Sequence, residues 1–385
     1  MRKVYHAILP TEADTFENEW EQCLQQLKKL LTGQLGLFKA VIFIDAQHDD
    51  IYYAKQEAII QSMSLVFGNQ TPTFTVLAEA PEKPFQVCIE AGLVDLSQAR
   101  LLYKNLEGIP YSFIESSQSK EVWATGMGSR CGKTTIEHSA IAAFEQMKQL
   151  LEAENLSFNH VVRQWNYISR IVDFDYVGED KFQHYQIFNE IRNHYYHQYR
   201  TVKGYPAATG IGTQAGGVSI DFCAATPFDV VKAISIQNPA QANPYRYKQN
   251  VLIGSVLAGK RKKQVPQFER GKLVINDVPT LYVSGTASII GQETIGINDV
   301  RLQTTTTIEN IKKLAATDNL KAHNGCLQQY PERPTLIRVY VKYPNDFGPI
   351  KQICAQMFPH IPAIYVVADV CRQDLLVEIE GEYGV

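Results

Sequence analysis

Apolar and polar positions alternate along much of the chain, and stretches with helical periodicity separate the alternating runs. The clearest alternation lies in residues 362–385, where a polar turn around Arg372 joins two strand-like runs. In the second run apolar side chains alternate with Glu378 and Glu380, so the two carboxylates share one face. Taken alone, this pattern favours an edge or surface strand whose acidic face meets water.

A predicted order of strand, helix, strand and strand recurs along the chain, and a strand and helix precede it. The front half is least well defined in the first copy, within residues 1–36. The remaining predicted elements are strand 37–44, helix 51–67 and strands 73–77 and 85–94; strand 121–127, helix 134–152, strand 160–168, helix 180–199 and strands 207–212 and 218–224; strand 281–289, helix 298–316, strand 336–343, helix 347–357 and the two C-terminal strands.

Repetition over about a hundred residues indicates fused modules rather than a solenoid. We therefore expect a mixed α+β fold in which three modules stand around a shared centre, as subunits do in a symmetric trimer. The predicted division is a degenerate module over 1–118, a second module over 119–235, a loop over 236–275 and a C-terminal module over 276–385.

Composition narrows the classes of function. The net charge of −3 over 385 residues provides no basic surface, which argues against nucleic acid as the main partner. Seven cysteines without a CxxC pair suit a reducing compartment, and we expect a cytoplasmic protein without a membrane segment. The histidines at 184, 194 and 197 lie on one predicted helix without a second ligand cluster, so we expect no metal site.

Two glycine-rich stretches are weak candidates for nucleotide binding. The stretch 126–134 has Met127 where a phosphate-binding loop needs a glycine, six residues before Lys133. The stretch 210–215 leads into a strand, whereas a dinucleotide fingerprint leads into a helix, so it indicates a turn.

The predicted helix 180–199 carries a stripe in which aromatic residues flank an arginine. The stripe consists of Tyr185, Phe188, Asn189, Arg192 and Tyr196. Arg192 either lays its stem along the core with its head in water or presents its planar fork to a carboxylate. Both interpretations stay open at this point.

The segment 234–273 is long, has little periodicity and carries aromatic residues beside arginines, which favours a functional loop over a flexible linker. Its aromatic residues are Tyr245, Tyr247 and Phe268, beside Arg246 and Arg270. Further along, Cys371 has no adjacent histidine, so a buried structural cysteine is the default.

Aligning the modules singles out one carboxylate. The position of Glu378 is Cys88 in the first copy and Ser219 in the second, whereas the position of Glu380 is acidic in all three, with Glu90 and Asp221. A recurrent carboxylate is typical of a structural role, and a unique one favours chemistry. Because the clefts of a trimer-like array lie between modules, we expect a helix of the second module to face the last strand of the third.

Several stretches together resemble the chorismatases, a family with the RidA/YjgF-like fold that releases pyruvate from chorismate. They are VVRQWNYI (161–168), HYQIFNEIR (184–192), PAATGIG (206–212), YRY (245–247), PQFER (266–270), VSGTASIIG (283–291) and VVADVCRQDLLVEIEGE (366–382). The resemblance extends from about Trp123 to the C-terminus. Two departures stand out: the segment 248–263 is longer than usual, and Ala208 and Ile364 occupy positions near which RidA deaminases carry an arginine, which disfavours imine hydrolysis.

The resemblance implies that Glu378 is the catalytic acid/base and that no cofactor is needed. It implies a chorismate pocket formed by Tyr185, Arg192, Tyr247 and Arg270 with Arg246 close by, and an influence of Ala287 and Cys371 on the product. To protonate carbon near neutral pH, Glu378 must have a raised pKa, which we expect from an apolar wall that includes Leu376.

The implied products are pyruvate and 3- or 4-hydroxybenzoate. The alternatives are hydrolysis to a dihydroxycyclohexadiene carboxylate, a RidA-like enzyme acting on imines or enamines, and a protein that only binds a small carboxylate. We expect a monomer or weak homo-oligomer whose partner is a small molecule, without nucleic acid or membrane.

Overall fold

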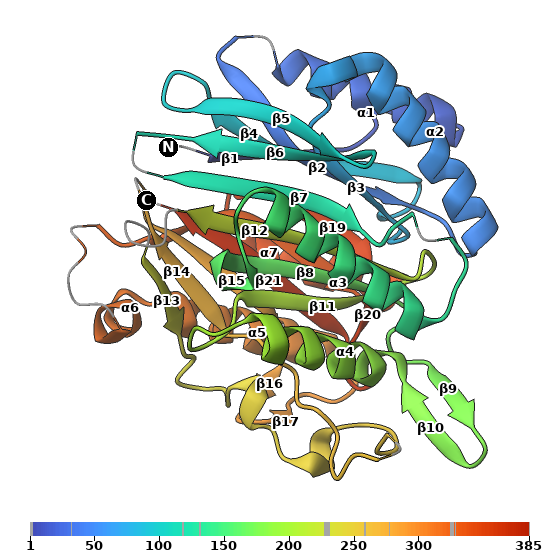
Figure 1. The fold of residues 1–385 in the computed structure, drawn as a ribbon, viewed down its shortest axis with the longest axis vertical. Helices are drawn as coiled ribbons and strands as arrows, with labels where there is room; N and C mark the ends of the chain where they lie inside the picture. The colour runs from blue at the N-terminus through green and yellow to red at the C-terminus, as the bar shows by residue number, and fades with distance from the viewer. Residues whose placement is uncertain are drawn as a thin grey trace.

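The computed structural model describes residues 3–31, 33–117, 119–130, 132–226, 232–257, 259–276, 278–323, 327 and 329–384. Three large sheets face a common centre and carry helices on their outer faces (Figure 1). The inner faces share one core that contains Trp123, Trp165, Tyr282 and Tyr340. A separate core lies beneath the helices of each sheet. The expected mixed α+β fold is confirmed.

The first sheet has the strand order β1-β4-β2-β3 and is covered by α1 and α2. Its elements are β1 (Lys3–Ile8), α1 (Phe16–Leu30), β2 (Leu35–Ile44), α2 (Asp49–Phe67), β3 (Thr73–Leu77) and β4 (Val87–Asp95). Thr15 caps α1 by accepting a hydrogen bond from the Asn18 amide, and the helix buries Trp20, Cys23 and Leu24 at helical spacing.

The second sheet has the order β20-β11-β8-β12-β7-β6-β5 and includes a short strand from the C-terminal part of the chain. Its elements are β5 (Arg100–Leu106), β6 (Ile109–Glu115), β7 (Lys120–Met127), α3 (Ile136–Ala153), β8 (Val161–Ser169), α4 (His184–Tyr199), β11 (Ala207–Thr213), β12 (Val218–Thr226) and β20 (Asp369–Val370). Strands β9 (Phe174–Val177) and β10 (Asp180–Gln183) form a separate ribbon, so α4 begins four residues later than predicted.

The third sheet has the order β13-β14-β15-β21-β18-β19. Its elements are β13 (Lys232–Ile236), β14 (Gly271–Ile275), β15 (Thr280–Ala287), α5 (Val300–Ala315), α6 (Thr317–His323), β18 (Arg333–Val341), α7 (Phe347–Met357), β19 (Ala363–Val367) and β21 (Val377–Gly384). A small ribbon of β16 (Ile289–Ile290) and β17 (Glu293–Thr294) lies beside it. The predicted loop region thus contains β14 and the end of β13, and β5 and β6 join the second sheet; the division into domains stays a prediction.

Strand pairing reproduces the alignment of the three modules. Equivalent central strands place Val41 opposite Glu90, Trp165 opposite Asp221, and Arg338 opposite Glu380. Two residues before each of these acids lie Cys88, Ser219 and Glu378. The strand pairing therefore agrees with the sequence alignment: of the three equivalent positions, only that of Glu378 carries a carboxylate.

The expectation that the acidic face of the last strand meets water is wrong. Strand β21 lies inside its sheet, between β15 and β18, and Glu380 faces the shared centre with 4% of its surface exposed. Arg163 and Arg338 approach its two carboxylate oxygens at 2.5 and 3.0 Å. Cations from two modules therefore neutralise an acid that the local pattern places at the surface.

Candidate active site

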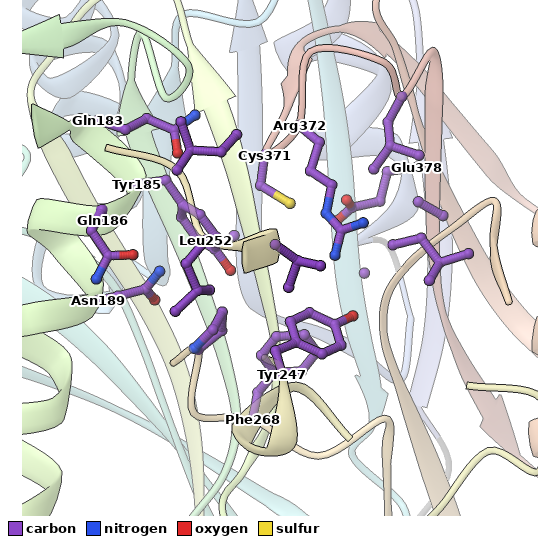
Figure 2. Close-up of a pocket in the computed structure, with 18 of the residues that line it drawn as sticks. Gln183, Tyr185, Gln186, Asn189, Tyr247, Leu252, Phe268, Cys371, Arg372 and Glu378 are labelled. Carbon is purple, nitrogen blue, oxygen red and sulfur yellow. The ribbon is translucent and has the colours of Figure 1, made fainter. Parts of the chain in front are cut away.

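A cleft opens between the second and third modules, where the unique carboxylate lies (Figure 2). It has about 710 Å³ of space between its walls, part of which is open to solvent. One wall is formed by α4 and β11, and the other by β15, β21 and the turn 371–375. The remaining side is lined by Tyr247, Leu252, Phe268, Arg270 and their neighbours. The helix of the second module faces the last strand of the third, as the module alignment predicts.

Glu378 points into this cleft from β21 (Figure 2). Burial raises the pKa of its carboxyl to about 8, with a further rise from Glu380 and opposing contributions from Arg270 and Arg163. Within the described part of the chain, no group donates a hydrogen bond to this carboxyl. The predicted rise of its pKa is confirmed, although Leu375 rather than Leu376 lines the cleft beside it. The arrangement provides a carboxylic acid that holds its proton near neutral pH.

A glycine makes room for the acid. Strand β15 has an irregular register between Val283 and Thr286, and Gly285 lies within it. A Cβ atom at Gly285 would overlap the Oε1 atom of Glu378 and lie 2.9 Å from its Cδ atom. The Gly285 amide donates a 3.0 Å hydrogen bond to Thr209 Oγ1 of the second module. The wall opposite the acid is therefore fixed across the module interface.

Two arginines carry positive charge into the cleft, and Tyr247 lies near both. Arg270 donates from Nη2 to the Ala242 carbonyl at 2.9 Å and to the Tyr247 hydroxyl at 2.6 Å. Arg372 donates from Nη1 to the Gln292 carbonyl at 2.9 Å. The guanidinium carbons lie 5.9 Å and 5.4 Å from the Tyr247 ring centre for Arg270 and Arg372, respectively. Each guanidinium group is held by hydrogen bonds along one edge, and its further N–H groups have no acceptor among the described residues, so they can bind an anion.

Helix α4 contributes neutral hydrogen-bonding groups. Burial raises the pKa of the Tyr185 hydroxyl well above its ordinary value, so this group is a donor. Its ring packs close to β11, where a Cβ atom at Gly210 would lie 3.0 Å from Cε2. The Asn189 and Gln183 side-chain NH₂ groups are buried and have no acceptor among the described residues. Buried donors without acceptors are costly, so both fit a ligand that accepts hydrogen bonds.

Six of the eight residues expected at the site line the cleft: Glu378, Tyr185, Tyr247, Arg270, Ala287 and Cys371. Arg192 does not line it; the side chain is 1% exposed and donates from Nη2 to Asn189 Oδ1 at 2.5 Å. Neither open interpretation of Arg192 describes this position, because its head is buried and its partner is an amide. Arg246 is exposed and lies outside the cleft lining.

Sequence reasoning missed Arg372, Asn189 as a cleft residue, and Gln183. A signal for Arg372 is present, since it stands in the polar turn directly before the strand of Glu378. Its neighbour Cys371 has a thiol pKa raised to about 12 by burial, with a further rise from Glu378. This thiol stays protonated and is no nucleophile at neutral pH.

The equivalent position between the first and second modules is filled. Tyr52 is 2% exposed and donates to the Val76 carbonyl at 2.9 Å. Its ring lies against Gly216, where a Cβ atom would approach to 2.7 Å. The equivalent of Glu378 there is Ser219, whose buried hydroxyl has no partner among the described residues. An acid-bearing cleft is thus retained between the second and third modules.

The described residues contain no group of three or more His, Cys, Asp or Glu side chains placed to hold a metal ion. None of the helices in the described ranges is long and apolar enough to cross a membrane.

Parts of this sequence are similar to a known family model and to known proteins. A family model described as chorismatase FkbO/Hyg5-like, N-terminal, matches residues 114–224. A 3-hydroxybenzoate synthase from Streptomyces hygroscopicus is 32% identical over 247 residues, which cover 62% of this chain and 67% of that protein. A chorismatase from Streptomyces rapamycinicus is 35% identical over 181 residues, 46% of this chain and 50% of that protein.

A crystal structure of a chorismatase matches the whole architecture. The TM-score is 0.70 at 20% sequence identity, and the match covers 100% of this chain and 99% of that chain. The match shows that the two proteins share a fold.

Proposed function

The chain belongs to the chorismatase family, and we propose that it cleaves chorismate to pyruvate and a hydroxybenzoate by protonating the enolpyruvyl ether. The observation that carries this proposal is the single buried carboxyl of Glu378, with its pKa raised to about 8, in a cleft that also contains two arginines. The proposal covers both isomers, 3- and 4-hydroxybenzoate, and product analysis decides between them.

The chemistry requires an acid of this kind. Cleavage begins when a proton is added to the terminal methylene carbon of the enol ether, which leaves an oxocarbenium ion at the adjacent carbon. An ionised carboxylate has no proton to give, so a carboxyl with its ordinary pKa near 4.5 would be inactive at neutral pH. Glu378 is neutral in this range, and after proton transfer its carboxylate faces the developing positive charge, which stabilises it.

Two carboxylates on the substrate match the two cationic forks. Arg270 and Arg372 both line the cleft, and each keeps N–H groups that have no acceptor among the described residues. Charge-assisted hydrogen bonds to carboxylates are about twice as strong as neutral ones. Tyr185 and Asn189 offer neutral donors on the opposite wall. We assign the two arginines to binding the substrate carboxylates, and the neutral donors to orienting oxygen atoms of the ring. Fixed orientation of the methylene carbon near Glu378 then lowers the entropic part of the barrier.

The two possible outcomes differ in what happens to the ring after pyruvate is released. Chorismate splits into pyruvate and a hydroxybenzoate with no net consumption of water, whereas hydrolysis adds one water and leaves a dihydroxycyclohexadiene carboxylate. Apolar side chains such as Leu252 and Phe268 line the cleft and limit the room for water beside the ring. This favours the hydroxybenzoate outcome, with Ala287 and Cys371 as the residues whose size sets that room.

The test is incubation of purified protein with chorismate, with pyruvate measured enzymatically and the second product identified by chromatography. We expect stoichiometric pyruvate and hydroxybenzoate, and loss of turnover in Glu378→Gln. The matched control is Glu382→Gln, an equally conservative change on the same strand at a buried acid outside the cleft. Absence of pyruvate with retained chorismate binding would support a binding protein, and full turnover in Glu378→Gln would refute the assignment of the acid.

A further inference from the structure

Behind the proposed acid lies a second carboxylate, that of Glu380, with an unusually complete set of partners. Its Oε1 atom accepts from Trp165 Nε1 at 2.8 Å and from the Tyr340 hydroxyl at 3.3 Å. Its Oε2 atom accepts from Arg163 Nη2 at 2.5 Å and from the Thr209 hydroxyl. With Arg338 also in contact, the side chain is held in one position by groups from two modules.

The geometry connects this carboxylate to the acid in two ways. Glu378 and Glu380 are two residues apart on one face of β21, a separation of about 7 Å along the strand. In addition, Thr209 Oγ1 accepts hydrogen bonds from the Gly285 amide at 3.0 Å and from Arg163 at 2.7 Å, so its own proton points to Glu380. Gly285 is the residue against which the Glu378 carboxyl rests.

We infer that Glu380 is a positioning residue for the reaction: its fixed negative charge keeps the proton on Glu378, and its bond to Thr209 holds the wall that aims the carboxyl. This inference rests on the proposed role of Glu378 and assigns a task to the carboxylate that recurs in all three modules. The sister acids have different sets of partners: Glu90 pairs with Lys39 and shares Arg338 with Glu380, and Asp221 accepts from the Gly126 amide.

The charges around Glu378 support this assignment. The titratable or charged groups that face it come from five parts of the chain and are Glu380, Arg163, Arg270, Cys371, Arg372, Tyr185 and Tyr247. Two of them, Cys371 and Tyr185, keep their protons at neutral pH because burial raises their pKa values, and the arginines favour the ionised form of Glu378. Among these groups, Glu380 is the one whose negative charge opposes ionisation, and burial adds to it in the same direction.

The consequence is a pKa that follows the charge at position 380. Glu380→Gln removes the charge and keeps the shape, so the pKa of Glu378 falls by about one to two units for a charge about 7 Å away. Because an acid must be protonated to act, pyruvate release in this variant is lost at pH 8 and largely retained at pH 6. Glu382→Gln alters another buried acid of the same strand, four residues from Glu378, and leaves the pKa of Glu378 unchanged.

The test is a pH titration by NMR of protein labelled with ¹³C at the glutamate side-chain carboxyl, with the Glu378 signal assigned by its absence in Glu378→Gln. Glu380→Gln leaves Arg163 without its ion-pair partner, whereas Arg338 keeps its ion pair with Glu90. The double variant Arg163→Gln/Glu380→Gln therefore provides a version that replaces a whole ion pair. We expect a lowered pKa of Glu378 in Glu380→Gln, a smaller drop in the double variant because Arg163 itself favours the ionised form, and a wild-type pKa in Glu382→Gln. An unchanged pKa of Glu378 in Glu380→Gln, or an equal drop in Glu382→Gln, overturns the inference.

The titration needs no substrate, so it is independent of the proposed function. If the chain fails to cleave chorismate, the NMR result still decides whether Glu380 controls the proton on Glu378. Thr209→Val completes the design because it breaks the link between Gly285 and Glu380 while leaving every charge in place. In that variant we expect kcat to fall about tenfold or more with the pKa of Glu378 retained.

Discussion

Replacing Gly285 by alanine is the sharpest perturbation that the structure offers. The added methyl group would overlap Oε1 of Glu378 and lie 2.9 Å from Cδ and 3.0 Å from Thr209 Cγ2. Contacts between carbon atoms are optimal at about 3.5–4.0 Å, so either the carboxyl or the strand must move. Because the Gly285 amide is bound to Thr209, the side chain of Glu378 is the part that gives way.

A carboxyl displaced by about 1 Å no longer meets the methylene carbon in line. Misplacement on this scale costs roughly 100-fold in rate, or about 2.7 kcal/mol of barrier. Arg270 and Arg372 keep their positions, so we expect the loss in kcat and little change in KM.

The assay is continuous pyruvate release at several chorismate concentrations, together with circular dichroism to confirm the fold. The matched control is Gly348→Ala in α7, where an added Cβ atom would meet nothing within 4 Å and where alanine favours the helix. A Gly285→Ala enzyme with kcat within threefold of wild type would refute the idea that this glycine makes room for the acid.

Three further outcomes follow from the same geometry. Arg372→Met removes one anion ligand, worth about 1.5–3 kcal/mol, so KM for chorismate should rise roughly 10- to 100-fold in steady-state kinetics, more than kcat falls. Glu378 has a folded pKa of about 8 against an ordinary 4.5. Between these values the folded protein keeps a proton that the unfolded chain has released, so the free energy of unfolding falls by at most about 4 kcal/mol as the pH rises from 5 to 8. Urea unfolding of Glu378→Gln should lack this fall. Cys371→Ala should retain pyruvate release within a few-fold, because the thiol is not a nucleophile, while chromatography shows an altered ratio of ring products.

Each of these outcomes has a control or a contrary result. For Arg372, the control is Arg301→Met on the exposed face of α5, and an equal rise in KM there would remove the argument for a specific anion ligand. For stability, a parallel pH dependence in wild type and Glu378→Gln would contradict the raised pKa. For Cys371, complete loss of pyruvate release would show that the thiol takes part in the chemistry.

The sequence was informative where local pattern and repetition sufficed. Strand Thr73–Leu77 and helix Phe347–Met357 have the predicted bounds, because apolar periodicity and flanking polar turns define them locally. The unique position of Glu378 followed from comparing modules, which needs no knowledge of tertiary contacts.

The burial of the acidic face could not be predicted, because its neutralising partners are distant in sequence. Glu380 meets Arg163, 217 residues away, and Arg338 meets Glu90, 248 residues away. Alternation along one strand contains no information about such partners, so it favoured a solvent-exposed face. The same holds for Arg192: helical spacing placed it on the stripe with Tyr185 and left open whether its head reaches the cleft.

The two-residue offset of Glu378 from a recurrent structural acid suggests how one competent site arises from three copies. In the shared centre, carboxylates at the positions of Glu90 and Glu380 balance buried cations, and the third acid, Asp221, accepts a hydrogen bond from the Gly126 amide. A further acid beside this centre acquires a raised pKa from burial and from its neighbour, and it gains access to substrate where the adjoining cleft stays open.

The pH dependence of kcat/KM for chorismate in the wild-type enzyme tests the central claim most directly, since this ratio reports the ionisation of essential groups in the free enzyme. With Glu378 as the proton donor, kcat/KM should be flat from pH 6 to 7 and fall about tenfold per pH unit above a pKa near 8. A rate that instead rises with pH through this range would mean that the ionised carboxylate is the active form, and would contradict the account.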